Sequence, residues 1–176
     1  MNDDPDAQAS DDAAAQPSDD GQRRHEEVLH AEGHDHVQGT HASTFEVTTD
    51  DYLTPAGDCI VGIEADRAPA DFDDGFVAAC QDEDARIVTE LSIVADGEEG
   101  ESAAGDALAQ RIVGRGDPDL AFENDRSAVW RTSDYVDDRT VAVGADHAAT
   151  DLDRDFVAAL AAGAELEVTL TVESPL

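Results

Sequence analysis

The chain contains the same segment twice, and this internal duplication constrains the architecture more than any other feature. Residues Asp58–Ala79 recur as Asp138–Ala159 at a constant spacing of 80 positions. A duplication predicts one supersecondary unit that is used twice and packs against its own copy. Residues kept in both copies are expected to build the fold, and residues found in one copy only are where a function can be added. The positions that are identical in both copies are Asp58, Val61, Ala65, Asp66, Ala68, Asp71, Asp73, Phe76, Val77, Ala78 and Ala79.

Composition separates a polar tail from a single folded unit. Residues 1–24 contain almost nothing to bury, which predicts a disordered acidic tail. Residues 25–176 suffice for one domain with one core, built of two repeats at about 25–95 and 107–174. The stretch Asp96–Asp106 has no apolar side chain larger than alanine and is the predicted linker.

The net charge of −33 arises from 43 acidic and only 10 basic side chains, all of them arginine. Such an acid excess without lysine resembles proteins of salt-accumulating haloarchaea. In about 1 M salt the Debye length falls to roughly 3 Å, so self-repulsion largely vanishes. We therefore expect a potassium-rich cytoplasm as the location of the protein.

The same charge restricts the classes of partner. The arginines are scattered and form no basic stripe, which argues against nucleic acid. No apolar run is long enough to span a bilayer, and the N-terminus lacks a basic-then-apolar signal, so no membrane is expected.

Apolar periodicity predicts the order strand, strand, helix, strand in each copy. The first copy is expected to have a strand ending near Thr49, a strand over 58–65, a helix from about Asp71 and a strand over 87–93. An additional strand is expected before each unit, over 27–33 and 108–113. The predicted fold class is α+β, with two strand-strand-helix-strand units related by a pseudo-twofold axis. These units would form a closed barrel or a two-layer sandwich.

Acidic residues shared by both copies have two interpretations. Asp66, Asp71 and Asp73 recur 80 positions later and could form carboxylate clusters for a hard cation. Asp71 and its counterpart Asp151 also stand where a helix N-cap is expected, and we favour this second interpretation. Cys59 and Cys80 lie on apolar faces and are expected to be structural.

Histidines distinguish the first copy from the second. His34, His36 and His41 correspond to Asp117, Asp119 and Asn124, which lie 83 positions later, so the fold does not require imidazole there. The alternative to a site is a histidine-rich turn plus one core histidine.

A hairpin that pairs Thr49 with Asp58 would place His41 opposite Asp66. A carboxylate that orients an imidazole is typical of a metal ligand or a general base. The sequence therefore predicts a metal site for zinc or another divalent cation at His34, His36 and His41. His41 and Asp66 are the candidate catalytic pair.

The order of several short motifs resembles the archaeal domain-of-unknown-function family 371 over about residues 26–172. This resemblance implies an archaeal origin and a small soluble protein, and it supplies no activity. Arg67 and His147 stand where less salt-adapted relatives are expected to carry basic residues, which implies a ligand-binding role toward an anionic group. The motifs are Gly33-His34, Thr40-His41, Ser43-Thr44, 53–60, 65–68 with Asp71, 116–120, 138–140 and 145–149 with Asp151-Leu152.

Three functions follow from this sequence. The leading hypothesis is a small-ligand- or metal-binding protein with a histidine-containing site in the first copy. The second is an enzyme that uses His41 and Asp66 as general base on a small anionic substrate. The third is a protein- or RNA-binding module without catalysis.

Overall fold

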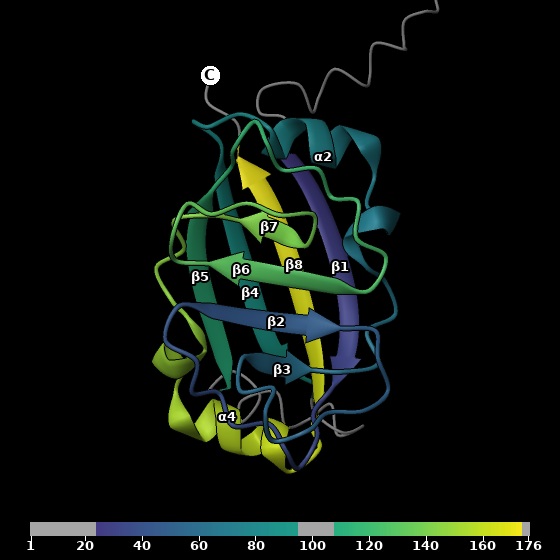
Figure 1. Ribbon diagram of the computed structural model, residues 1–176, viewed down its shortest axis with the longest axis vertical. Coiled ribbons are helices and arrows are strands. Elements are labelled where there is room, and N and C mark those ends of the chain that lie inside the picture. Colours follow the sequence, from purple (N-terminus) through teal and green to yellow (C-terminus); the bar gives the residue numbers. More distant parts are fainter. Residues whose placement is uncertain (1–23, 95–107, 174–176) are drawn as a thin grey trace, which may run out of the picture.

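A computed structural model describes residues 24–94 and 108–173 and arranges them in two four-stranded sheets (Figure 1). The first sheet is antiparallel throughout, and its strands lie in the order β1-β8-β4-β5. Long alternating apolar segments form it because each places one face toward the core. Its strands are β1 (Arg24–Glu32), β8 (Glu165–Glu173), β4 (Arg86–Ile93) and β5 (Ala109–Arg115).

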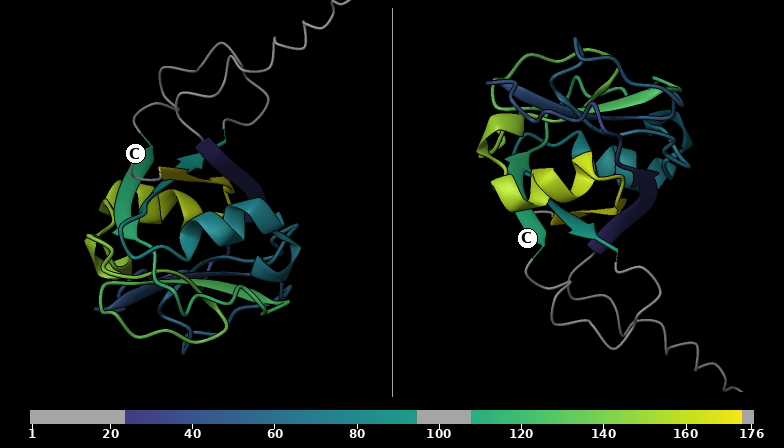
Figure 2. Two further views of the ribbon diagram at one scale, coloured as in Figure 1. Left: turned by 90° about the horizontal axis from the view of Figure 1, so that it is seen from above. Right: turned by 90° about the horizontal axis from the view of Figure 1, so that it is seen from below.

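The second sheet is made of shorter strands in the order β3-β2-β6-β7. Its two central strands are antiparallel, and each outer strand is parallel to its neighbour. In Figure 1 these strands run across those of the first sheet, and the views in Figure 2 show the two sheets as separate layers. The strands are β3 (Ile60–Gly62), β2 (Thr44–Thr48), β6 (Ser127–Arg131) and β7 (Thr140–Ala142).

Helices α2 (Asp74–Cys80) and α4 (Arg154–Ala161) lie at opposite ends of the molecule (Figure 1). Each helix begins with an aspartate whose side chain accepts a backbone N–H two residues later: Asp73 from Gly75 and Asp153 from Asp155. These carboxylates satisfy amides that have no partner inside the helix.

Asp71 and Asp151, predicted to cap these helices, instead close a 3₁₀ turn that precedes each one. The carboxylate of Asp71 accepts the N–H of Ala68 at 2.9 Å, and Asp151 accepts that of Ala148 at 2.9 Å. The helices therefore begin two residues later than expected for caps at Asp71 and Asp151.

The core lies between the two sheets and under the helices. At its centre the ring of Phe45 stacks on that of Trp130, with centroids 4.6 Å apart. The indole Nε1 of Trp130 donates to the buried hydroxyl of Thr89 at 2.9 Å, so its polar atom is satisfied.

The two halves of the chain are interleaved rather than packed side by side. β1 of the first half pairs with β8 of the second, and β5 of the second half pairs with β4 of the first. Each half also has one isolated bridge at the same place, between Glu32 and Ile63 in the first and between Arg115 and Val143 in the second. Counterparts lie 83 positions apart up to Tyr52 and 80 apart from Asp58 onward. Origin by duplication stays a prediction.

The predicted fold class is wrong. Over residues 24–94 and 108–173 neither sheet closes into a barrel, because β1 and β5 are the edges of one sheet and β3 and β7 are the edges of the other. The expected hairpin is also wrong, since β2 and β3 are parallel. The connection over 49–59 is long enough to carry the chain back before the second strand begins.

Some predicted segments lie outside the described residues: 1–23 of the tail and the linker Asp96–Asp106. Arg24, placed in the tail by composition, already belongs to β1. In the part of the chain that the structure describes, no helix is long and apolar enough to cross a bilayer.

Candidate functional site

The loop after β1 brings three potential metal ligands together. His34, Asp35 and His36 each offer one nitrogen or oxygen, and these atoms all lie within 4.8 Å of one another. The imidazole centroids are 5.0 Å apart. The N–H of His34 donates to the carbonyl of Leu160 at the end of α4, which fixes the start of the loop.

The hydrogen bonds of the two rings define their free nitrogens. Nδ1 of His36 lies 2.8 Å from the carbonyl of Leu53, which can only accept, so Nδ1 carries the hydrogen. Nε2 of His36 therefore keeps its lone pair. Nδ1 of His34 accepts the N–H of His36 at 2.9 Å, so its own lone pair points into the loop.

Asp35 was missed as a ligand by sequence reasoning. Its Oδ1 lies 3.1 Å from Nδ1 of His34, and its side chain is 82% exposed. Its position in the sequence, between the predicted ligands His34 and His36, could have identified Asp35 as a further candidate ligand. An extended chain would point it to the opposite face, whereas the turn brings all three side chains to one side.

His41 lies outside this cluster and serves as a turn cap. Its Nδ1 accepts the N–H of Ser43 at 3.3 Å and that of Thr44 at 3.2 Å, just before β2. In the second half, Oδ1 of Asn124 accepts the N–H of Arg126 at 2.9 Å and that of Ser127 at 2.7 Å. The imidazole of His41 thus makes the hydrogen bonds that the amide of Asn124 makes before β6.

Asp66 lies beside His30 rather than opposite His41. Its Oδ1 accepts the N–H of His30 at 2.9 Å, and its own N–H donates to the carbonyl of His30. Asp146 makes the same pair of bonds with Val113 in the second half. The predicted proximity of His41 and Asp66 is wrong because it depended on the antiparallel hairpin.

Arg67 and His147, the predicted anion ligands, are engaged within the fold. Arg67 forms a 2.6 Å ion pair with the buried carboxylate of Glu27 and donates to the carbonyl of Val28. Nδ1 of His147 lies 2.9 Å from Asp146. Burial raises the pKa of Asp146, but the hydrogen bonds with His147 and with the N–H of Val113, together with the charge of His147, outweigh this effect and leave the pKa lowered. Anion binding by Arg67 and His147 stays a prediction.

Neither cysteine contributes a reactive thiolate. Burial, together with the carboxylate of Glu46, raises the pKa of Cys59 to about 12. Burial also raises the pKa of Cys80, which lies in the core under α2. Both side chains are therefore protonated thiols at neutral pH, and neither acts as a thiolate ligand or nucleophile.

Comparison with known proteins identifies the family. The family described as "Domain of unknown function (DUF371)" matches residues 29–173. The "Uncharacterized protein MJ0206" of Methanocaldococcus jannaschii is 33% identical over 139 residues, covering 79% of this chain and 93% of that protein. The match confirms the resemblance seen in the motifs. The chain belongs to the DUF371 family.

Proposed function

We propose that the protein binds a divalent transition metal, with zinc as the first candidate, at His34, Asp35 and His36. The observation that carries this proposal is the convergence of their ligand atoms within 4.8 Å. Two imidazoles and a carboxylate are a donor set suited to zinc. His41, the third ligand expected from the sequence, is replaced in this proposal by Asp35.

The contact between His34 and Asp35 supports a cation here. If Nδ1 of His34 accepts the N–H of His36, its lone pair also faces Oδ1 of Asp35 at 3.1 Å. Two acceptors at that distance repel each other. A metal ion that takes the lone pair of Nδ1, in place of the N–H of His36, and also binds Oδ1 of Asp35 relieves the repulsion, as does protonation of the ring.

The contact between His36 and Leu53 supports the same assignment. A metal-bound imidazole usually donates its other N–H to a carbonyl or carboxylate, which fixes the orientation of the ring. His36 already makes this bond, at 2.8 Å, through Nδ1. Its Nε2 is therefore oriented for coordination before a metal arrives.

Calorimetric titration with zinc chloride in molar potassium chloride tests the proposal. We expect one site per chain, and at least a tenfold weaker affinity in His36→Gln and in Asp35→Asn, since each removes one ligand. His41→Asn is the matched control, because Asn124 shows that an amide can make the same turn bonds. Its affinity should equal that of the native chain.

Two outcomes would contradict the proposal: no zinc binding to the native chain, or unchanged affinity in both ligand variants. A loss confined to His41→Asn would instead return the site to the ligand set expected from the sequence. The experiment uses the full chain, and circular dichroism of each variant checks that it folds.

The cytoplasmic, potassium-rich location remains our expectation from composition. The enzymatic and the protein- or RNA-binding alternatives remain predictions, and we favour the metal site because the geometry of its ligands supports it directly.

A further inference from the structure

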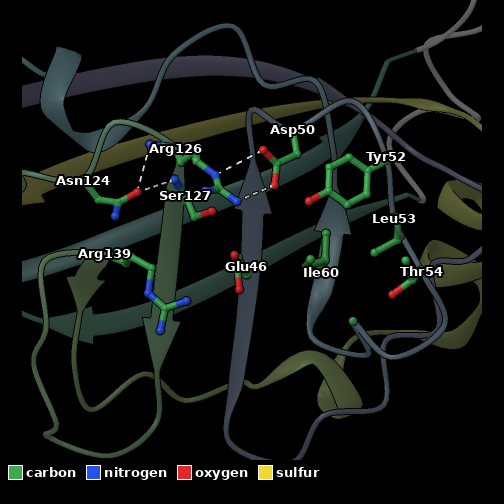
Figure 3. Close-up of a pocket in the computed structure, with 11 residues that line it drawn as sticks. Glu46, Asp50, Tyr52, Leu53, Thr54, Ile60, Asn124, Arg126, Ser127 and Arg139 are labelled. Atoms are coloured by element: carbon green, nitrogen blue, oxygen red, sulfur yellow. Dashed lines mark hydrogen bonds and ion pairs between the residues drawn. The ribbon is translucent and has the colours of Figure 1, made fainter.

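A polar pocket of about 340 Å³ lies on the face of the second sheet that is turned away from the core. It is bounded by the loop after β2, by the start of β6 and by Arg139 just before β7 (Figure 3). The His34–His36 loop does not line it. Its volume falls at the lower end of the range for small-molecule sites.

Besides the ion pair of Asp50 and Arg126, the pocket contains one carboxylate and one guanidinium. Figure 3 shows Glu46 on β2 between Ile60 and Arg139. Among the described residues, Glu46 has no ion-pair partner within 4.0 Å and accepts only a weak bond from the thiol of Cys59 at 3.4 Å. Arg139 binds Asp137 through Nη2 at 3.2 Å and remains 41% exposed, so its other nitrogens can reach a ligand.

The upper rim is formed by an ion pair and an exposed ring. Arg126 contacts both carboxylate oxygens of Asp50, each at 3.2 Å, so these two charges compensate each other. The side chain of Tyr52 is 58% exposed, and that of its counterpart Tyr135 is 59% exposed. In Figure 3 Tyr52 lies beside Asp50.

In the second half of the chain, an arginine side chain lies over Tyr135, which is the counterpart of Tyr52. The guanidinium of Arg131 lies over the ring of Tyr135, 4.8 Å from its centroid, and binds Asp137 at 2.9 Å. The counterpart of Arg131 in the first half is Thr48, which has no charge. Among the described residues, no arginine lies over the ring of Tyr52.

Two charged residues of the pocket have uncharged counterparts in the other half of the chain. Glu46 stands where the second half has Val129, and Arg139 stands where the first half has Cys59. The first half thus has an uncharged side chain where the second half has Arg131, and the pocket contains the carboxylate of Glu46. A cationic group from outside that stacks on the ring of Tyr52 would make the contact that Arg131 makes with Tyr135.

We propose that this pocket binds a small zwitterion of the amino-acid type. The ammonium group pairs with Glu46 near the ring of Tyr52, and the carboxylate pairs with Arg139. Both contacts are charge-assisted hydrogen bonds, which are stronger than neutral ones. A zwitterion has no net charge, so the excess of 33 negative charges does not repel it as it would a simple anion.

Titration of the full chain with common L-amino acids, one at a time in molar potassium chloride, tests the proposal by NMR chemical shifts. We expect saturable shifts at Glu46, Tyr52 and Arg139 for at least one amino acid. The methyl ester of the amino acid that binds lacks the carboxylate, and the N-acetyl derivative of the same amino acid lacks the ammonium group. Each should bind at least tenfold more weakly.

The variants Glu46→Gln and Arg139→Gln should each weaken binding at least tenfold. Arg86→Gln is the matched control, since it removes an arginine paired with Glu173 on the other sheet. Thermal unfolding checks each variant, and the ester and N-acetyl series on the native chain decides the matter if Arg139→Gln does not fold. The proposal is overturned if no amino acid binds, if either derivative binds as tightly, or if Glu46→Gln keeps full affinity.

Discussion

The loop over 33–41 and its counterpart over 116–124 make the same turns with different chemical groups. Nδ1 of His34 accepts the N–H of His36 at 2.9 Å, and Oδ1 of Asp117 accepts that of Asp119 at 2.8 Å. His41 and Asn124 show the same replacement before the next strand. The scaffold needs an acceptor at these positions rather than an imidazole. A neutral histidine meets that need with Nδ1, and its Nε2 then carries the hydrogen and can donate it.

A second comparison explains why only one half needs an arginine under its helix. The N–H of Asp73 donates to the buried Glu27 at 2.6 Å, and that of Asp153 donates to Gln110 at 2.9 Å. A buried carboxylate requires a cation, whereas a neutral amide does not. Arg67 neutralises Glu27, and this difference allows His147 in the other half.

The largest expected effect concerns the core, where the halves exchange large and small side chains. Phe45 and Trp130 have Ala128 and Val47 as their counterparts. Phe45→Ala would leave both positions small and open a cavity against Trp130. We expect a loss of about 3–5 kcal/mol in the free energy of unfolding, measured by denaturant titration in molar potassium chloride. A loss below about 1 kcal/mol would contradict the stacked core.

A smaller loss is expected when the ion pair is broken. Arg67→Ala leaves Glu27, which is only 6% exposed, without its cation, and we expect a cost of about 2–3 kcal/mol. The double variant Glu27→Gln with Arg67→His copies the second half and should recover most of this loss. Equal stability of the single and double variants, again by denaturant titration, would refute the comparison.

Asp137 provides a test by pH. Burial raises its pKa, but hydrogen bonds from Arg139, Thr140 and Arg131 outweigh burial and hold the pKa at about 2, below the ordinary 3.8. A depressed folded-state pKa means that the stabilisation is present above about pH 4 and is lost as the pH falls toward 2. We expect about 1–2 kcal/mol of pH-dependent stability, absent in Asp137→Asn, by acid titration of the unfolding free energy. An identical acid profile in both proteins would exclude this role.

The smallest effect tests whether the fold needs a hydrogen-bond acceptor or an imidazole ring at His41. His41→Ala removes the acceptor for two backbone amides and should cost about 1 kcal/mol. His41→Asn restores an acceptor, as in Asn124, and should cost less than about 0.5 kcal/mol. Thermal unfolding of the two variants checks this order, and a reversal would show that the ring itself is needed there.

Prediction from sequence was most accurate where local periodicity decides the structure. The long strands β4 and β8 follow from strict alternation, and the additional strands before each unit are confirmed as β1 and β5. The helices were placed correctly and their caps were not, because Asp71 and Asp73 have the same chemistry and only the intervening 3₁₀ turn distinguishes them.

Prediction of the site failed where it depended on strand direction. Two short strands with an apolar face pair equally well in either direction as far as their own residues show. Because β2 and β3 are parallel, the hairpin that would have placed His41 opposite Asp66 does not form. His34 and His36 do lie close together, as the predicted metal site requires, because two residues of one turn are neighbours whatever the direction of the strands.

By itself, the sequence determined the equivalence of the two halves, most of the strands and the family, since these depend on local pattern and on order along the chain. Only the tertiary structure decided how the halves interleave, which acceptor each turn uses and which charges meet in the pocket. Those features come from contacts between residues far apart in the chain, such as Arg67 with Glu27 or Arg126 with Asp50. Their free energy depends on burial and strand direction, which no local segment specifies.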